Sequence, residues 1–388
     1  MDFALNDQQK LVRDTARQFM ETELRPHLRQ YEREEHFPAE EMRRLGELGF
    51  CGMLIPEEWG GVGADTVSYV AMLEEVARVD ASTAVTLSVT NFVAGPLLRH
   101  GTQTQKERWL PRLASGEILG AFCLTEPEAG SDAGAIQARA ERRGDRYVLN
   151  GTKIWVTNGG QAGLYIVFAK TDPGAGRRGV SAFLVEPGAP GFHIVRYEDK
   201  MGLRISHSAQ IAIEDCAVDA GQMLGAEGEG LKIALSGLDS GRIGIAAQSV
   251  GVAQGALEMA VRYAKQRRAF GQAISGFQAI QWKLADMQTE IDAARMLVWQ
   301  AAWLRDQGAG RLGRFSSQAK LYASEMANRV VYQAVQIHGS AGYSRESEIE
   351  RFYRDARVLT IYEGTSEIQR LVIARDLLGG HDGRERGQ

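Results

Sequence analysis

One glutamate near the C-terminus, Glu363, stands in a context that suits acid–base chemistry. It lies in IYEGTSEIQR, residues 361–370, between an aromatic residue and a Gly-Thr-Ser step. Ser366 and Gln369 have the three-residue spacing of a capping box, which predicts a helix that starts here. A helix start offers unpaired backbone N–H groups that suit an anion. The carboxylate therefore has two interpretations: a solvated loop residue, or a base aimed at a ligand whose anionic part the next helix holds.

Two further stretches carry residues of the kind that contact a flat cofactor. FCLTEPEAGSD, residues 122–132, offers hydrogen-bond donors to a heterocycle or a phosphate, and its alternative interpretation is an ordinary turn before a strand. In WVTN, Trp155 and Thr157 lie on the same face of a predicted strand. A tryptophan on a strand is also common in a protein core, so this pattern leaves both interpretations open.

Two stretches in the C-terminal half suit a phosphate or a closely approaching backbone. RRAFGQ, residues 267–272, places Arg267 where it can pair with a pyrophosphate, and a solvated helix end is the alternative. QIHGSAGY, residues 336–343, is a glycine-rich helix terminus that allows close backbone approach, and a simple C-cap is the alternative.

Several other kinds of site are missing from the sequence. We find no GxGxxG, Walker, GxSxG or HExxH motif, and no βαβ rhythm, so a dinucleotide site on a parallel sheet is not expected. The three cysteines, Cys51, Cys123 and Cys216, are far apart and odd in number. They predict reduced thiols rather than a disulfide scaffold, and no metal site is predicted.

Composition excludes some functional classes. The 388 residues allow two or three domains, and the formal net charge of −4 shows no bias toward nucleic acid or anionic membranes. No apolar run approaches the length that spans a bilayer, and the start MDFALNDQQK lacks a signal peptide or an Arg-rich presequence. We therefore expect a cytoplasmic protein of bacterial type with no membrane or nucleic-acid partner.

Residue patterns divide the chain into three predicted domains. Residues 1–119 are mainly helical, beginning with a capping box formed by Asn6 and Gln9. Residues 120–230 have a period of two, which predicts a small barrel or two packed sheets. Residues 231–388 return to helical periodicity and predict a bundle. The predicted bundle seam consists of Leu284, Met287, Ile291, Ala294, Val298 and Ala301.

The middle domain carries the clearest turn signal. Asn150-Gly151 separates two strand-like runs within residues 146–158, which predicts a hairpin at that dipeptide. Four more strand-like runs follow, LYIVFAK, VSAFLVE, FHIVR and AQIAIED, and a second long helix is expected from about Phe315 to Ile337 in the last domain.

The motifs together resemble those of one known family. CLTEPEAGSD, WVTNGG, RRAFGQ, VQIHGSAGY and IYEGTSEIQR, in this order and at these separations, resemble the acyl-CoA dehydrogenases over about residues 3–379. LDSGRIGIAAQSVG, residues 238–251, is similar to the short-chain and short/branched-chain members. The resemblance implies an α+β multidomain fold: an N-terminal all-α domain, a middle β-barrel or sandwich domain, and a C-terminal four-helix bundle. It also implies a homotetramer, a dimer of dimers.

The resemblance implies FAD held between the β domain and the bundle, with one group of residues reaching the adenine-diphosphate half of a neighbouring subunit's FAD. Thr365 and Glu367 would lie near the phosphates. Ser340 departs from the glycine that many members have at its position. The implied cofactor residues are Phe122, Leu124, Thr125, Gly130, Ser131, Trp155, Thr157, Arg267, Phe270, Gln278, Gln336, Gly339, Ser340, Thr365 and Glu367.

Glu363 is similar in position to the family's catalytic base. Isovaleryl-CoA and long-chain members carry that glutamate at the position of Gly241 instead, so the resemblance argues against those two subclasses. Arg242 has a second interpretation as a buried structural arginine. The implied substrate-binding residues are Ser131, Asp239, Arg242, Gly364 and Arg375.

The implied reaction is the α,β-dehydrogenation of an acyl-CoA thioester to a trans-2-enoyl-CoA. Glu363 abstracts the α-proton, a hydride passes to flavin N5, and an electron-transfer flavoprotein accepts the electrons. Burial beside the thioester and flavin would raise the proton affinity of the carboxylate.

Four alternatives remain at this level. An acyl-CoA oxidase is the nearest, although the chain lacks the long C-terminal extension seen in many oxidases. A nitroalkane oxidase is disfavoured because that activity is associated with Asp at the base position. A non-catalytic binder of nucleic acid or protein, and a purely structural helical protein, fit the set of motifs less well. Acyl chain length, pathway and electron acceptor are not readable from the sequence, although the resemblance favours short or short-branched acyl groups.

Overall fold

Local capping starts the helical N-terminal part as the sequence predicts. In the computed structural model, which describes residues 4–308 and 310–379, Asn6 Oδ1 accepts a hydrogen bond from the Gln9 backbone N–H at 2.9 Å. The Gln9 side chain accepts one from the Asn6 N–H at 2.9 Å. This confirms the predicted capping box. The N-terminal helices are α1 (Asp7–Phe19), α2 (Arg25–Glu34), α3 (Ala39–Glu47), α4 (Thr66–Val79), α5 (Ala81–His100) and α6 (Gln103–Ala114).

The helix α5 is the centre of the N-terminal part. Its N-cap is Asp80, whose Oδ2 accepts from the Thr83 N–H at 2.7 Å, and whose Oδ1 accepts from Arg351 at 2.7 Å. This helix is long and apolar enough to cross a membrane, with a mean hydropathy of 1.3, but 89% of that window is buried inside the protein. The prediction that no apolar run approaches a membrane-spanning length was therefore wrong, and the run is a core helix.

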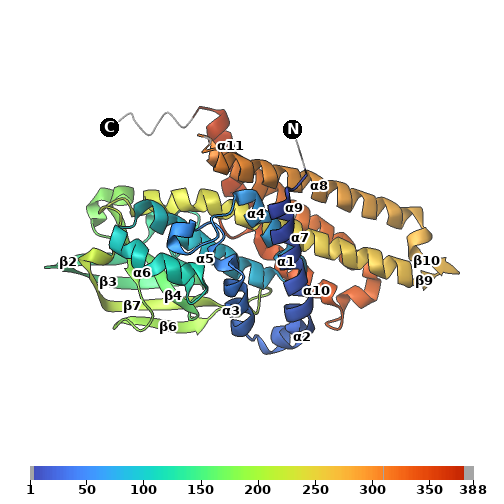
Figure 1. Cartoon of the computed structure of the whole chain (residues 1–388), viewed down its shortest axis with the longest axis horizontal. Coiled ribbons are helices and arrows are strands. Elements are labelled where there is room, and N and C mark those ends of the chain that lie inside the picture. The colour runs from blue at the N-terminus through green and yellow to red at the C-terminus, as the bar shows by residue number, and fades with distance from the viewer. Residues whose placement is uncertain (1–3, 309, 380–388) are drawn as a thin grey trace.

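The middle of the chain forms one mixed sheet at one end of the molecule (Figure 1). Its strands run in the order β6-β7-β3-β2-β4-β5-β8, and β1 pairs with β4. The β1–β4 and β2–β4 pairs are parallel, and the other pairs are antiparallel. The strands are β1 (Leu119–Cys123), β2 (Arg139–Arg143), β3 (Arg146–Thr157), β4 (Ala162–Lys170), β5 (Val180–Val185), β6 (Phe192–Tyr197), β7 (Ser208–Asp219) and β8 (Met223–Leu224).

The predicted hairpin at Asn150-Gly151 was wrong. Strand β3 runs straight through this dipeptide, and the pairing register with β7 shifts between Leu149 and Gly151. The Asn150 amide exchanges two hydrogen bonds with Asp215 on β7, at 2.8 and 3.1 Å, so the dipeptide forms a bulge within the ladder. The hairpin turn lies six residues earlier, where Gly144 has φ 65° between paired Arg143 and Arg146.

Long helices form the C-terminal part, together with a two-stranded hairpin at the end of the molecule opposite the large sheet (Figure 1). The predicted seam is confirmed, because Met287, Ile291, Ala294, Val298 and Ala301 are buried, while Leu284 is half-buried. The elements are α7 (Gly230–Gln266), β9 (Arg268–Ala269), β10 (Gln272–Ala273), α8 (Gln278–Asp306), α9 (Leu312–His338), α10 (Glu348–Ala356) and α11 (Ser366–Leu377).

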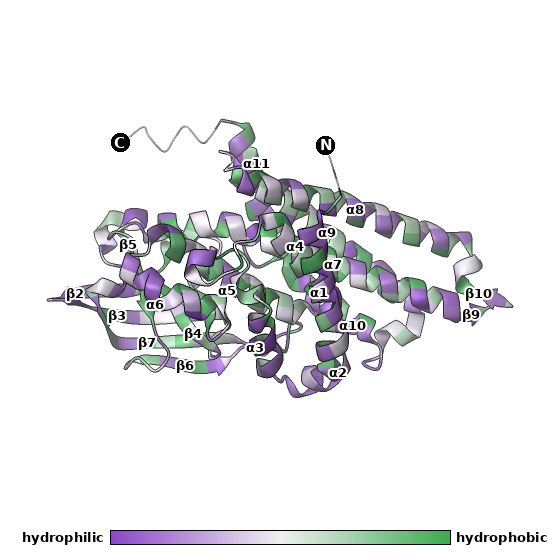
Figure 2. Cartoon of the chain, viewed as in Figure 1, coloured by the Kyte–Doolittle hydropathy of each residue, from purple (hydrophilic) through white to green (hydrophobic). Residues whose placement is uncertain are grey.

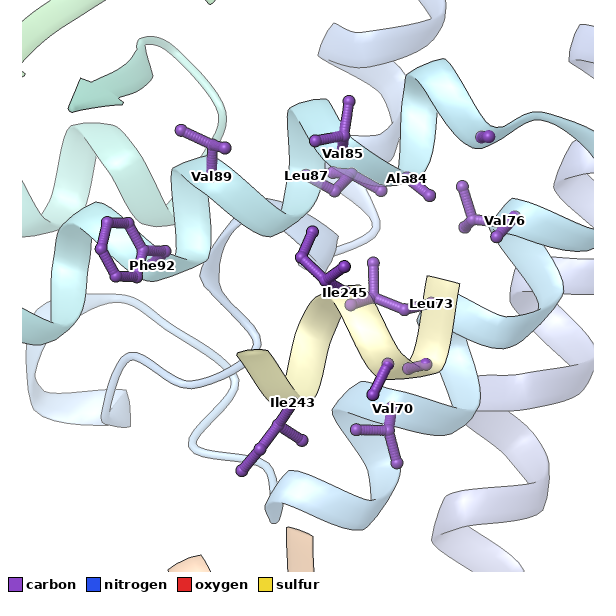
Figure 3. Close-up of a cluster of buried hydrophobic side chains, with 14 of the residues drawn as sticks. Val70, Leu73, Val76, Ala84, Val85, Leu87, Val89, Phe92, Ile243 and Ile245 are labelled. Atoms are coloured by element: carbon purple, nitrogen blue, oxygen red, sulfur yellow. The ribbon is translucent and has the colours of Figure 1, made fainter. Parts of the chain in front are cut away.

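Two apolar cores result, and the larger joins the N- and C-terminal helices. Hydrophobic residues concentrate along the central helices α4, α5 and α7, whereas the β9–β10 hairpin is largely hydrophilic (Figure 2). Side chains of α4 and α5 pack against Ile243 and Ile245 of α7 in this core (Figure 3). The smaller core lies within the sheet domain. The architecture of helical, β and helical parts confirms the predicted fold class.

A buried ion pair attaches the segment after β1 to the sheet. The Lys153 ammonium on β3 is 2.7 Å from the Glu126 carboxylate and also donates to the Leu124 carbonyl at 3.2 Å. Glu126 accepts further hydrogen bonds from the backbone N–H groups of Gln137 and Ala138. Both charged side chains are almost completely buried, at 0% and 5% exposure. Each charge therefore depends on its partner.

Removing the cation of this pair should be costly. We expect Lys153→Ala to lower the free energy of unfolding by about 3–5 kcal/mol, because it leaves a buried carboxylate without compensation. Arg143→Ala, which breaks the exposed 3.4 Å pair with Glu141, is the control and should cost less than about 1 kcal/mol. Denaturant unfolding followed by circular dichroism measures both, and equal losses would contradict the assigned role of the buried pair.

Candidate active site

Glu363 lies in a turn of unfavourable backbone geometry between two helical segments. Its φ is 54° and that of Gly364 is 90°, so two successive residues have left-handed conformations. A non-glycine residue in this region is uncommon and costs on the order of 1 kcal/mol or more. The turn persists only if its surroundings fix it.

Three side chains fix this turn, two from helices α11 and α9 and one, Tyr362, from the turn itself. Gln369 Nε2 donates to the carbonyls of Glu363 and Gly364, at 3.1 and 2.8 Å. Lys320 Nζ, on α9, also donates to the Gly364 carbonyl at 2.8 Å. The Tyr362 hydroxyl donates to Gln248 on α7, whose amide in turn donates to the Ala81 carbonyl at 2.7 Å. The turn is therefore tied to α5, α7, α9 and α11.

The predicted capping box at Ser366 and Gln369 was wrong. Thr365 is the N-cap of α11, and its hydroxyl accepts from the Ile368 N–H at 3.4 Å. The Gln369 amide instead reaches past the helix start and donates to the two carbonyls of the strained turn. The predicted helix itself is present and begins at Ser366, one residue earlier than a Ser366 cap would place it.

The carboxylate of Glu363 occupies a dry environment. Its Oε2 atom is buried and has no hydrogen-bond partner within residues 4–308 and 310–379. Burial raises the pKa of the Glu363 carboxyl to about 7, against the opposing attraction of Arg242 and Lys320. The group is thus poised to exchange a proton near neutral pH.

Gly241 on α7 makes room for this carboxylate. A Cβ atom at Gly241 would lie 2.7 Å from Glu363 Oε2 and 3.2 Å from the Phe92 ring. Phe92 packs edge-on against Phe122 of β1, with ring centroids 4.7 Å apart. Contacts therefore run from the carboxylate through α7 and α5 to the first strand of the sheet.

The segment after β1 lies beside the C-terminal end of β3, at an edge of the sheet formed by strand ends, and both carry predicted cofactor residues. The Ile154 N–H donates to the Thr125 carbonyl at 3.0 Å, which places the segment after β1 beside β3. Trp155 is 55% exposed at φ 56°, an unusual conformation for a bulky residue. Along this edge Phe122, Thr125 and Thr157 are half-buried, Leu124 is buried, and Gly130 and Ser131 are exposed.

A buried amide connects this edge to α5. Asn158, directly after β3, donates to the Gly120 carbonyl at 2.9 Å and to the Thr86 carbonyl at 3.2 Å. Asn158 is completely buried. The exposed Trp155 therefore lies close in sequence to Asn158, which buried hydrogen bonds fix in place.

The second group of predicted cofactor residues lies far from Glu363 in the same chain. These residues surround the β9–β10 hairpin and the ends of α7 and α9 (Figure 1). Phe270 at the hairpin tip is 95% exposed with φ 49°, and a 4.4 Å stack of Tyr263 on His338 joins the two helix ends. The exposed members of this group are Arg267, Phe270, Gln278, Gln336, Gly339 and Ser340.

The predicted substrate residues differ in their exposure to solvent. Arg242 is 5% exposed, donates to Asp239 at 2.7 Å, and its Nε has no partner within the described part of the chain. Arg375 is exposed on α11, and Glu367 lies exposed at the start of that helix. The predicted α11 positions therefore face solvent, whereas Arg242 is close enough to the Glu363 carboxylate to lower its pKa.

Sequence reasoning missed Lys320, which is completely buried. A signal existed: Lys320 lies within a row of small residues at helical spacing on α9, formed by Ser317, Ser324 and Ala327, all of which are buried. A lysine on an otherwise buried face needs a polar partner, and here that partner is the Gly364 carbonyl.

Family comparisons agree along nearly the entire chain. Residues 6–117, 121–216 and 228–378 match the models of the acyl-CoA dehydrogenase N-terminal, middle and C-terminal domains. The chain belongs to the acyl-CoA dehydrogenase family. It is accordingly an oxidoreductase that acts on acyl-CoA, and acyl-CoA dehydrogenases are flavoproteins.

Similar sequences include short-chain enzymes. The mitochondrial short-chain specific acyl-CoA dehydrogenase of Mus musculus is 47% identical over 375 residues, covering 96% of this chain and 91% of the relative. The acryloyl-CoA reductase (NADH) of Anaerotignum propionicum is 46% identical over 380 residues, covering 97% and 96%.

Solved structures share the fold closely. The butyryl-CoA dehydrogenase of Megasphaera elsdenii has a TM-score of 0.95 at 45% identity, with 97% of this chain and 100% of that chain covered. A chain from structural work on the electron transferring flavoprotein of Acidaminococcus fermentans has a TM-score of 0.96 at 46% identity, covering 97% and 100%.

The contact between Gly241 and Glu363 can be tested directly. We expect Gly241→Ala to lower acyl-CoA turnover at least tenfold, because the added methyl group displaces the Glu363 carboxylate. Gly221→Ala is the matched control, since its Cβ would meet no atom within 4 Å. Steady-state kinetics at saturating substrate measure both variants, and unchanged turnover in Gly241→Ala would contradict the assigned geometry.

Proposed function

We propose that this chain dehydrogenates a short acyl-CoA thioester between its α- and β-carbons to give a trans-2-enoyl-CoA, with Glu363 as the base. The carrying observation is the buried Oε2 atom of Glu363, which has no hydrogen-bond partner within the described residues. Short acyl groups are proposed because the mitochondrial enzyme of Mus musculus is short-chain specific and the Megasphaera elsdenii enzyme acts on butyryl-CoA.

The residues at the sheet edge fit a flat cofactor, and we assign it as FAD. Trp155 presents an exposed aromatic face in a strained conformation, and Thr125 lies beside it on the adjacent segment. Phe122, Leu124, Thr157 and the Gly130–Ser131 step would complete the binding surface, with Thr365 and Glu367 near the phosphates. Bound FAD would supply the acceptor for the β-hydrogen as hydride.

Glu363 holds the α-proton in this proposal. Its carboxylate accepts the proton because burial has already raised its pKa to about 7, close to the working pH of a cytoplasmic enzyme. Its own backbone N–H is the proposed donor to the thioester carbonyl oxygen, where negative charge develops. The clamped turn keeps the carboxylate and this N–H in one fixed arrangement.

Arg242 and Lys320 limit how far the pKa of Glu363 rises. Both cations lower the pKa of Glu363 against the effect of burial. Burial lowers the pKa of Lys320 itself to about 8, partly offset by Glu363. We assign Arg242 a second role beside Asp239 and Gly364 in holding the thioester end of the substrate.

Partner assignments follow from the distribution of exposed residues. The hairpin group around Phe270 lies far from the chain's own Glu363, which supports the proposal that it completes the FAD site of a neighbouring subunit in a homotetramer. Exposed aromatic residues on α8 and α9, Trp282, Trp303 and Tyr332, offer apolar area for such an assembly. An electron-transfer flavoprotein is the proposed electron acceptor, as the structural relative from Acidaminococcus fermentans suggests.

Reaction in the reverse direction is the second candidate, since the reductase of Anaerotignum propionicum is as similar as the dehydrogenases. Three assays separate the candidates. Enoyl-CoA formation with an electron-transfer flavoprotein indicates the dehydrogenase, NADH-dependent reduction of enoyl-CoA the reductase, and peroxide yield under air the oxidase.

The base assignment predicts a selective loss. Glu363→Gln should fold and retain FAD but lose nearly all acyl-CoA dehydrogenation, at least 1,000-fold, because the amide cannot accept the α-proton. Anaerobic bleaching of the flavin by acyl-CoAs of four to sixteen carbons measures this step. Glu58→Gln, an exposed glutamate in the N-terminal part, is the control. Bleaching at the wild-type rate in Glu363→Gln would remove the proposed base.

The charge environment predicts the pH dependence. The base must be ionised, so the rate of flavin reduction should rise with pH through about 7 and level off above it. Lys320→Met removes a buried cation that favours the carboxylate, so the midpoint should move to higher pH by about one unit. Lys232→Met, at an exposed lysine paired with Glu229, is the control.

A stopped-flow pH profile decides this prediction. A midpoint that stays fixed in Lys320→Met, or that moves equally in the control, would contradict the electrostatic role. The other ionisable groups that act on Lys320 or on Glu363 are Tyr69, Arg242, Glu325, Tyr362 and Glu367.

A further inference from the structure

A second polar cavity lies where four helices begin or end. Its volume is about 470 Å³, and its wall combines the starts of α4 and α9, the ends of α5 and α8, and one turn of α7. The residues that matter for its chemistry are Thr66, Arg99, Ser240 and Arg305.

The cavity carries positive charge. Arg99 from α5 and Arg305 from α8 form no ion pair within residues 4–308 and 310–379. Arg305 donates to the Thr66 hydroxyl at 2.8 Å. The one carboxylate that lines the wall, Asp306, is already occupied by the backbone N–H and hydroxyl of Thr66. The two guanidinium groups thus line a cavity without a direct ion pair in the described residues, although Asp239 and Asp306 act on them electrostatically.

Arg305 is half-buried, whereas Arg99 is exposed at the rim of the cavity. Burial lowers the pKa of Arg99, which Asp239 partly offsets, and burial likewise lowers the pKa of Arg305. Asp239 is itself engaged by Arg242 at 2.7 Å. Desolvated guanidinium groups pair strongly with carboxylates and phosphates, because their planar donors match two oxygens at once.

The cavity adjoins the proposed acyl site. Ser240 directly precedes Gly241, whose Cβ position touches the Glu363 carboxylate. Tyr69 lies one helical turn after Thr66, and it interacts electrostatically with both Arg305 and Glu363. Its hydroxyl is 3.4 Å from Ser88 on α5, opposite Gly244 of α7. Tyr69 and Ser88 therefore form a polar pair beside α7, near both the cavity and Glu363.

We infer that Arg99 and Arg305 bind an anionic group of the acyl-CoA substrate. The inference rests on the proposed function, because it takes the substrate to be an acyl-CoA. Two parts of such a ligand carry that chemistry: a carboxylate at the far end of the acyl chain, and the 3′-phosphate of CoA. Either group would meet two arginine side chains that form no ion pair within the described part of the chain.

Binding measurements on a Glu363→Gln background test the inference without turnover. Isothermal titration calorimetry of the FAD-loaded protein would measure the Kd of pentanoyl-CoA, glutaryl-CoA and 3′-dephospho-pentanoyl-CoA. Each Kd would be compared between the Glu363→Gln protein and the same protein that also carries Arg99→Gln or Arg305→Gln. Arg112→Gln, an arginine of α6 in an exposed pair with Glu117, is the matched control. Thermal unfolding identifies any variant that fails to fold, and Arg305→Lys then replaces Arg305→Gln.

Two results support the inference and identify the source of the anion. If the cavity binds a terminal carboxylate, both variants weaken glutaryl-CoA at least tenfold and leave pentanoyl-CoA unchanged. If it binds a CoA phosphate, both variants weaken pentanoyl-CoA at least tenfold and leave its dephospho form unchanged.

Two other results overturn it. Equal weakening of all three ligands indicates a structural effect alone, and no change in any Kd shows that the arginines bind no part of the substrate. Failure of the proposed function is distinguishable, because flavin bleaching by pentanoyl-CoA in the wild-type protein reports it separately.

Discussion

The proposed active site depends on one strained turn that other helices hold in place. Glu363 and Gly364 both have left-handed backbone conformations, and a chain free to relax would leave them. Gln369, Lys320 and Tyr362 prevent this by satisfying or anchoring the peptide groups of the turn. The carboxylate points into a dry space because its own main chain cannot turn it elsewhere.

The same logic applies to the proposed cofactor surface at the sheet edge. A sheet edge that presents an exposed, strained tryptophan needs rigid neighbours, and two buried polar groups provide them. Lys153 joins β3 to the segment after β1 through Glu126, while Asn158 joins the end of β3 to α5. Buried polar groups are costly unless fully paired, and here the pairing connects β3 to the segment after β1 and to α5.

Sequence patterns predicted those features that depend on local chemistry. The Asn6–Gln9 capping box and the seam of α8 were readable because spacing alone determines them. Asn150-Gly151 was misread because its amide pairs with Asp215, 65 residues away, and a bulge and a turn share the same dipeptide. Gln369 was misread for a similar reason, since its partners are carbonyls outside the helix. Lys320 was missed because only the folded chain brings its ammonium to Gly364.

The anchoring of α5 has a consequence for the synthesis of the protein. Asp80, which begins this nearly all-buried helix, pairs with Arg351, 271 positions later in the chain. The helix also packs against α7, which starts at Gly230. A ribosome therefore releases one of the most apolar segments long before its partners exist, and the nascent chain must keep that segment from aggregating until translation is almost complete.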